Sequence, residues 1–223
     1  MSRNVASLTD ARESERPDIK PFTPAEAKAF LQAIHGDRLE ALYKVALTMG
    51  LRQGEVLGLR WLDVDFEGGT LHVSEQLQRV GGKLVRVPLK TARSRRTLAV
   101  PKFVVESLRE HRRHQVAEQR STESWSDTGY IFTTITDQPL EASIRPVRFH
   151  DLRHSTATLL LVQGVAPRVV MEILGHSQIA TTMNIYTAAV PELQRKAAAR
   201  MDDLLLAPDL ERPVAAVLLP RLH

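Results

Sequence analysis

The chain has 223 residues and no cysteine, which excludes disulfides, thiol catalysis and cysteine-ligated zinc. No apolar run approaches the roughly 20 residues that a membrane span needs, and the polar start of the chain fits neither a signal peptide nor a transit peptide. We therefore expect a cytoplasmic protein that does not bind membranes, and its net charge of +4 and pI near 9.6 favour polyanionic partners.

The first helices are predicted from local signals. Thr23, Pro24 and Glu26 form a capping-box pattern, in which a threonine caps the helix, a proline takes its first position and a glutamate returns to the cap. A second helix is predicted over 38–49, followed by a short helical turn from Arg52.

The middle of the chain is rich in β-forming residues. Four segments show this composition: 62–66, 70–75, 83–89 and 97–100. Glycine pairs at 68–69 and 81–82 separate the first three segments. This pattern predicts a small antiparallel sheet built from hairpins.

Helical patterns then return. They cover 101–119, 151–163, 167–175, a short segment that carries Tyr186, and 191–206. The fold class predicted from the whole pattern is α+β, mainly α, with a small antiparallel β-sheet.

Basic residues gather around the third and fourth β-rich segments, without an acidic residue among them. The predicted DNA-contacting members of this set are Lys83, Arg86, Arg93, Arg95 and Arg96. A second cluster, REHRRH, covers 109–114, and 23 of the 30 basic residues are arginine, the better bidentate partner of phosphate. A GC-rich genome would raise the arginine content as well, and a basic run is also typical of a solvated surface.

Four separated stretches carry polar side chains that a core helix does not need. They are MGLRQGEVLGLRWLDVD with Arg52 and Glu55, PLKTARSRRTLAV with Lys90, RFHDLRHSTATLL with His150 and Arg153, and LGHSQIATTMNIYT with His176 and Tyr186. Taken singly, each residue has an ordinary structural explanation, such as a surface ion pair, a helix cap or a packing tyrosine. Together they form a set that suits an anionic phosphodiester.

The residue types of that set can each take a role in the cleavage of a phosphodiester. Two guanidinium groups can hold the non-bridging oxygens of a phosphate without a metal ion. A tyrosine hydroxyl has a pKa near 10, so neighbouring arginines and histidines are needed to stabilise the phenolate that attacks. Lys90 is a plausible proton donor to the departing 5′-oxygen. The product is a phosphotyrosyl link that conserves the phosphodiester energy, so neither ATP, metal nor another cofactor is expected.

These motifs, in this order, resemble the catalytic pattern of the tyrosine recombinase (phage integrase) family. The resemblance runs from about residue 19 to residue 206. It implies the catalytic set Arg52, Lys90, His150, Arg153, His176 and the nucleophile Tyr186, with Glu55 as the acidic partner of the first arginine. It also implies a site-specific recombinase that forms a 3′-phosphotyrosyl intermediate on double-stranded DNA, acting as a tetramer on DNA and existing as a monomer in free solution.

The resemblance divides the chain into a linker or arm over 1–20, a catalytic domain over 21–206 and a C-terminal tail over 207–223. Members of the family carry an N-terminal core-binding domain, of which only the linker is expected here. Only 17 residues separate Phe132 from His150, where the family has a further DNA-contacting helix, and Ala188 replaces a histidine often found two residues after the tyrosine.

Three alternatives remain open from the sequence. A prophage-integrase remnant could bind DNA without catalysis. A type IB topoisomerase would share the chemistry. A zinc hydrolase could use His150 and His154, which are spaced i,i+4 on one helix, with His176 as a third ligand.

Overall fold

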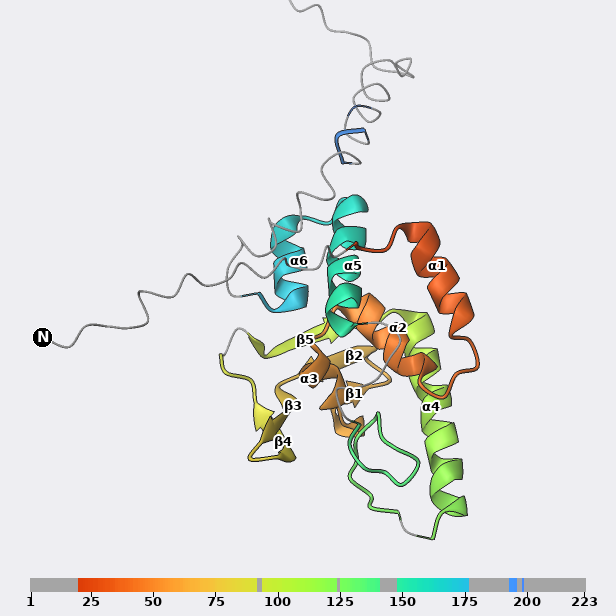
Figure 1. Cartoon of the computed structure of the whole chain (residues 1–223). Coiled ribbons are helices and arrows are strands. Elements are labelled where there is room, and N and C mark those ends of the chain that lie inside the picture. The colour runs from red at the N-terminus through yellow and green to blue at the C-terminus, as the bar shows by residue number, and fades with distance from the viewer. Residues whose placement is uncertain are drawn as a thin grey trace, which may run out of the picture.

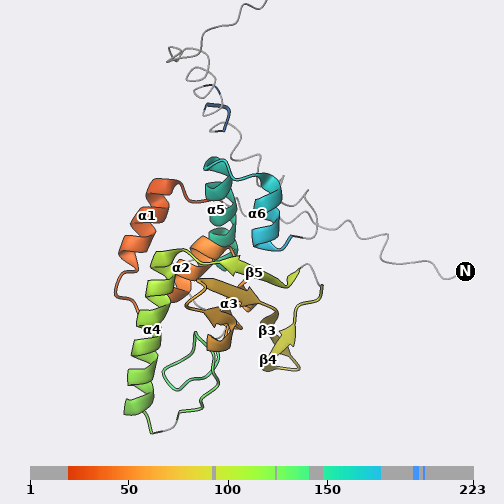
Figure 2. The same ribbon diagram turned by 180° about the vertical axis from the view of Figure 1, so that it is seen from behind.

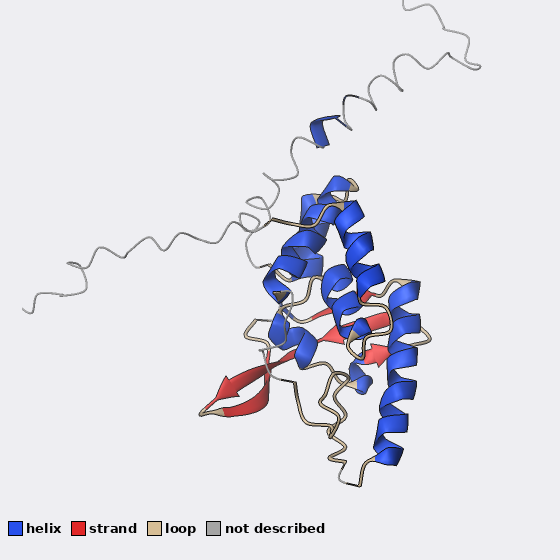
Figure 3. Cartoon of the chain, turned by 45° about the vertical axis from the view of Figure 1, so that its right-hand side comes forward, coloured by secondary structure: helices blue, strands red, loops and turns tan. Residues whose placement is uncertain are grey.

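The computed structural model describes residues 20–91, 94–123, 125–140, 148–176, 193–195 and 198. The helices are α1 (Pro24–Ala33), α2 (Glu40–Met49), α3 (Gln53–Leu57), α4 (Lys102–Ser121), α5 (Phe149–Val162) and α6 (Pro167–Leu174). The strands are β1 (Val64–Asp65), β2 (Thr70–Val73), β3 (Glu75–Val80), β4 (Lys83–Pro88) and β5 (Arg96–Ala99). The predicted class, α+β with mainly helical structure, is confirmed (Figures 1 and 3).

Helix α1 begins as its sequence predicts. The Thr23 hydroxyl accepts a hydrogen bond from the Glu26 amide at 3.2 Å, and the Glu26 carboxylate accepts one from the Thr23 amide at 2.8 Å. The preceding Phe22 amide donates to the Ser155 hydroxyl of α5 at 2.9 Å. The start of the described chain is therefore fixed to the helix that carries part of the candidate site.

Helix α2 is the centre of the hydrophobic core. Most of its side chains are buried, because it packs against α4 on one side and α5 on another. It begins two residues later than predicted, since Arg38 lies in the preceding turn and its guanidinium donates to the Glu118 carboxylate and to the Thr133 carbonyl. Gly50 ends it in the left-handed conformation, with φ at 57°.

The strands form two sheets where the sequence predicted one. The first has the order β1-β2-β5, with Leu71 opposite Leu98, and the second is the isolated hairpin β3–β4, whose turn is Gly81-Gly82. The hairpin projects from the body of the molecule on the side away from α4 (Figures 1 and 3). Strand β2 therefore pairs with a strand that comes after the whole hairpin in the chain.

The strand predicted over 62–66 is mostly a turn. Trp61–Asp63 forms a 3-10 helix, and only Val64–Asp65 pairs with β2. The Asp63 carboxylate accepts from the Arg60 amide at 2.7 Å, which closes this turn and leaves Leu62 exposed.

Helices α5 and α6 pack against each other and enclose a small second apolar cluster of Ala157, Leu161, Val170 and Leu174. Seen from behind, they lie together at one end of the molecule, while α4 runs along the opposite side from the β3–β4 hairpin (Figure 2). Among the described residues we find no helix long and apolar enough to pass through a bilayer.

Candidate active site

The C-terminal ends of α2 and α6 meet at two glycines. Gly50 and Gly175 both have positive φ, at 57° and 67°, which glycine adopts without strain. A Cβ on Gly50 would lie 2.5 Å from Cδ2 of the buried Leu174, so no larger residue fits between the helices there. This close approach places the last carbonyls of two helices, which have no partner within their own helix, beside each other. Cations are stabilised next to such helix C-termini.

Arg153, on the buried face of α5, binds both helix ends. Its guanidinium donates to the Gly50 carbonyl at 2.6 Å and to the Leu174 carbonyl at 2.8 Å, and the residue is only 6% exposed. Burial and the charge of Arg52 lower the pKa of Arg153 to about 9. The group therefore remains charged at neutral pH, and these two bonds use two of the five N–H donors that a guanidinium carries.

Glu55 is a fully buried carboxylate at the centre of the cluster, with 0% exposure. It accepts from the Arg52 amide at 3.0 Å, from the Arg52 guanidinium at 2.9 Å and from the Arg96 guanidinium at 2.9 Å. Burial by itself would raise the pKa of Glu55, but the hydrogen bonds and charges of Arg96 and Arg52 outweigh it and lower that pKa. Glu55 is thus ionised and holds two arginines in fixed positions.

Arg52 faces solvent more than the other members of the cluster. Its side chain is 42% exposed, although it is bound to Glu55 and donates to the Gly175 carbonyl at 3.1 Å. The bond to Gly175 joins the turn after α2 to the end of α6. An anion approaching from solvent therefore meets a guanidinium whose orientation is already set.

Arg96 has a position that the sequence did not predict. It was expected to contact DNA, but its side chain is 7% exposed and binds Glu55, while its Nε donates to the Ile173 carbonyl of α6 at 2.7 Å. A Cβ on Gly175 would lie 2.8 Å from the Arg96 guanidinium. One sequence signal pointed to this burial: Arg96 and the buried Leu98 are two residues apart on β5 and so share a face.

His176 follows the end of α6 and is half-buried, with its amide bound to the Met171 carbonyl at 3.0 Å. Burial, followed by the charges of Arg153 and Arg52, lowers the pKa of His176 to about 4. The imidazole is therefore neutral at pH 7. A bound anion would offset the arginine charges and raise this pKa.

His150 lies beside His154, the residue that follows Arg153 in α5. The Nε2 atoms of the two rings are 2.9 Å apart, so one nitrogen donates and the other accepts. Burial, together with the charges of His150 and Arg153, lowers the pKa of His154. His150 itself is exposed on the first turn of α5.

The remaining predicted residues lie apart from the cluster or outside the described chain. Lys90 is exposed and lies in the connection between β4 and β5, two residues after the end of β4 and six residues before Arg96. Tyr186 and Arg93 lie outside the described residues. Of the basic set, Lys83 and Arg95 are exposed, whereas the Arg86 guanidinium is bound to protein carboxylates.

The chain contains three tyrosines, and two of them are buried. Tyr43 is 4% exposed in the core of α2, where burial raises the pKa of its hydroxyl, and Tyr130 is 7% exposed. Neither can reach a phosphate held at the surface of the molecule. The third tyrosine, Tyr186, lies outside the described residues.

A zinc site does not arise from the predicted histidines. Within the described part of the chain, which includes His150, His154 and His176, no group of three or more histidine, aspartate or glutamate side chains is placed to hold a metal ion. The cluster instead contains three guanidinium groups and one carboxylate, a net charge of +2 beside a neutral imidazole. This arrangement suits a tetrahedral oxyanion such as a phosphodiester.

The chain matches the model of a known protein family. The model of the Phage integrase family matches residues 20–192. The chain belongs to the phage integrase family. The matched region contains the whole arginine and histidine cluster and Tyr186.

Curated integrase-family relatives are considerably longer than this chain. A tyrosine recombinase XerC-like protein of Caldanaerobacter subterraneus subsp. tengcongensis is 34% identical, over 87% of this chain and 56% of its own length. The ICEBs1 integrase of Bacillus subtilis is 31% identical, over 92% of this chain and 60% of its own length. The chain therefore spans little more than half of the curated relatives it matches.

Solved structures of the family share the fold. The Tn1549 transposon integrase, in complex with transposon right end DNA, matches with a TM-score of 0.67 at 23% identity, covering 92% of this chain and 71% of that one. The XerA recombinase matches with a TM-score of 0.61 at 24% identity, covering 85% and 66%. At this level of identity the likeness establishes the fold.

Proposed function

We propose that the chain cleaves and rejoins double-stranded DNA as a site-specific recombinase, through a 3′-phosphotyrosyl link at Tyr186. The observation that carries this proposal is the cluster at the joined ends of α2 and α6. It holds Arg52, Arg153 and neutral His176 around one place, with Arg52 facing solvent. Family membership and the burial of the other two tyrosines support it.

Strand cleavage exchanges one bond to phosphorus for another. The Tyr186 oxygen forms a bond to phosphorus, and the bond from phosphorus to the 5′-oxygen breaks. Arg52 and Arg153 stabilise the charge on the non-bridging oxygens. A histidine of the set, His150 or His176, accepts the tyrosine proton, and Lys90 protonates the 5′-oxygen.

Rejoining is the reverse of this step, with a 5′-hydroxyl attacking the phosphotyrosine. The number of phosphodiester bonds is conserved, so the reaction requires no ATP, and the arginines supply the charge stabilisation that a metal ion would supply elsewhere. Glu55 and Arg96 are positioning residues in this scheme, because they act on the phosphate through Arg52.

The same proposal includes the domain organisation, the oligomeric state and the cellular location of the chain. Residues 21–206 form the catalytic domain, preceded by an arm over 1–20 and followed by a tail over 207–223. The chain is a monomer in free solution, assembles as a tetramer on DNA and works in the cytoplasm.

A nicked suicide duplex tests the function. It carries the junction sequence of the element that encodes the chain, and the short fragment beyond the cleavage point diffuses away, which traps the covalent intermediate. We expect a protein–DNA adduct that withstands denaturation and forms in EDTA without ATP. Binding of the duplex without any adduct would identify the chain as a non-catalytic DNA-binding remnant, and relaxation of plasmids without a specific site would identify a topoisomerase.

A further inference from the structure

Helix α4 carries a row of arginines that the active-site cluster does not use. Its core-facing side chains are Val104, Leu108, His111 and Gln115. Four exposed arginines lie on a different face: Arg109, Arg112, Arg113 and Arg120. Their spacing of i, i+3, i+4 and i+11 keeps them on one side of the helix, over a length of about 16 Å at 1.5 Å per residue.

These arginines form one wall of a groove. Phe66 and Glu67, in the turn between β1 and β2, lie on the other side, and the groove has a volume of about 700 Å³. Arg109 lies 5.3 Å from the centre of the Phe66 ring, and its Nη2 donates to the Phe66 carbonyl at 3.1 Å. Arg112 lies 5.4 Å from the centre of the Trp61 ring, which stacks on Phe66.

Cation–π contacts of this kind order the arginine side chains before any partner arrives, while the N–H groups stay available as donors. The rings beneath are covered by Arg109 and Arg112, so an incoming partner meets positive charge first. The residues that line the groove include four arginines and one glutamate, Glu67. Arg109 lies 3.7 Å from Glu67, and Arg113 is ion-paired with Glu110 beside the groove. The net charge of +2 thus comes from Arg112 and Arg120. A polyanion therefore fits this surface.

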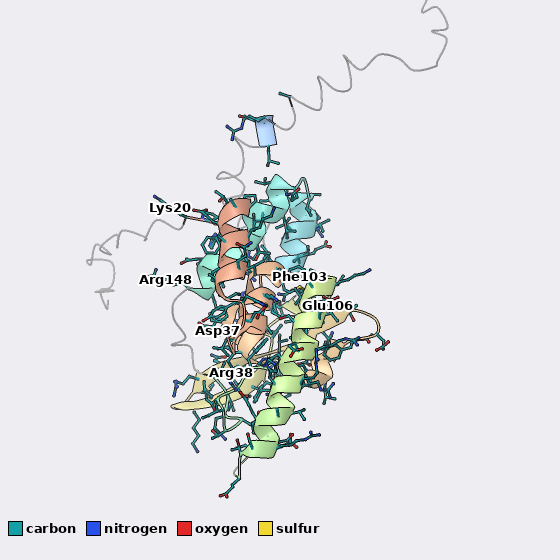
Figure 4. All side chains as sticks on the ribbon, turned by 90° about the vertical axis from the view of Figure 1, so that its right-hand side faces the viewer. Lys20, Asp37, Arg38, Phe103, Glu106 and Arg148 are labelled. Atoms are coloured by element: carbon teal, nitrogen blue, oxygen red, sulfur yellow. The ribbon has the colours of Figure 1, made fainter. Side chains whose placement is uncertain are left out.

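The groove and the active-site cluster lie on different sides of the molecule. Helix α6, whose C-terminal end forms part of the cluster, is on one side in Figures 1 and 2, and α4 is on the other. Figure 4 looks onto the α4 side, where Phe103 and Glu106 mark the first turns of this helix. DNA bound at the cluster leaves the groove facing away from it.

We infer that the α4 groove binds the phosphate backbone of a second DNA duplex. The inference extends the proposed function, because it assumes that the first duplex occupies the active-site cluster. A row of exposed arginines about 16 Å long matches about five base pairs of duplex at 3.4 Å each. An acidic protein segment is the other polyanion of suitable size, but Arg109 and Arg112 cover the two rings, so only the small side chains of Val116 and Ala117 remain as an apolar anchor for it.

The first test is the salt dependence with which a second duplex binds the full chain after the active-site cluster has been saturated with a first duplex. The variant R112Q/R120Q removes two exposed arginines and leaves Arg109, which is bonded to the backbone. Each phosphate contact contributes about 0.9 to the slope of log affinity against log salt, so the slope of R112Q/R120Q should be less steep than that of the wild type by about 1.8. Between 50 and 200 mM salt the variant should therefore lose about twelvefold less affinity than the wild type. The matched control K28Q/K102Q removes the same charge from exposed positions outside the groove and should keep the wild-type slope.

The second test is bridging between two duplexes that carry different fluorophores. The wild type and K28Q/K102Q should bring the two duplexes together, and R112Q/R120Q should lose this energy transfer while its melting temperature and its adduct on the suicide duplex are unchanged. Bridging that survives in R112Q/R120Q would overturn the inference, because it would have to come from another surface or from association of two chains. Binding of a poly-glutamate peptide to the groove at salt concentrations that remove DNA would also overturn it. If the wild type bridges duplexes through the groove but forms no adduct, the proposed function fails and the inference stands.

Discussion

Substitution of Arg96 by glutamine tests how the cluster is held together. Arg96 connects β5 to the Glu55 carboxylate of α3 and to the Ile173 carbonyl of α6, and the residue is almost completely buried. Glutamine keeps a polar side chain of moderate length but removes the positive charge and the fork of donors. The exposed neighbour Arg95 offers a matched control, since R95Q makes the same change in charge one residue away.

The expected loss follows from the burial of Glu55. Removing one partner of a buried ion pair costs about 3–5 kcal/mol, because the other charge stays behind without compensation. Arg52 still binds Glu55 in R96Q, so we expect the lower end, about 3 kcal/mol. In a domain of this size that corresponds to a fall in melting temperature of about 6–12 °C.

The loss should depend on pH. In the wild type the pKa of Glu55 is lowered on folding, so its contribution to stability is present above the unfolded-state pKa of about 4.3 and is lost as the pH falls. In R96Q the lowering by Arg96 is lost, so the pKa of Glu55 is higher than in the wild type. The carboxylate therefore takes up a proton earlier on acidification, and the penalty is relieved. The difference in unfolding free energy between the wild type and R96Q is therefore full near pH 7 and shrinks towards pH 4.

Urea unfolding at several pH values, read by circular dichroism, measures this difference. R95Q should stay within about 0.5 kcal/mol of the wild type, as surface substitutions do. On the suicide duplex R96Q should cleave more slowly with unchanged duplex affinity, because its guanidinium is not exposed to DNA. Equal stability of R96Q and R95Q between pH 5 and 8 would refute the positioning role.

Three further predictions concern the same cluster. G50A should be about 1–3 kcal/mol less stable than the control variant G36A in urea unfolding. Both glycines have positive φ, but only a Cβ on Gly50 meets Leu174. Equal losses of stability in the two variants would show that the helix ends are not in close contact. The His176 ring, followed by NMR, should titrate at about pH 4 in the free protein and at higher pH with orthovanadate bound, whereas a midpoint near 6.5 in the free protein would contradict its burial among arginines. R153A should slow adduct formation by about 10² or more in a single-turnover assay, on the scale of lost oxyanion contacts, and an unchanged rate would remove Arg153 from the phosphate site.

Local signals in the sequence predicted much of the helical structure. The Thr23–Glu26 capping box acts over a few residues, so pattern and geometry agree. The pairing of β2 with β5 could not be predicted, because the β3–β4 hairpin lies between them in the chain and nothing local specifies a partner beyond it. The segment 62–66 has β-forming residues, but the bond from the Arg60 amide to Asp63 turns the chain first.

The candidate site was also predicted only in part from the sequence. The motifs identified Arg52, Glu55, Arg153 and His176, which the structure brings together. Arg96 was assigned to the DNA surface because it stands in a basic run, and its true partner, Glu55, is 41 residues away. Burial decides the role of such an arginine, and burial depends on tertiary contacts that a charge pattern does not contain.

The most direct test is to identify the residue that becomes linked to DNA. The adduct formed on the suicide duplex is digested with a protease and a nuclease, and the peptide that carries the nucleotide is sequenced by mass spectrometry. We expect the nucleotide on Tyr186, and Y186F should bind the duplex without forming any adduct. A nucleotide on Tyr43, Tyr130 or a serine, or an adduct formed by Y186F, would contradict the assignment of Tyr186 as the nucleophile.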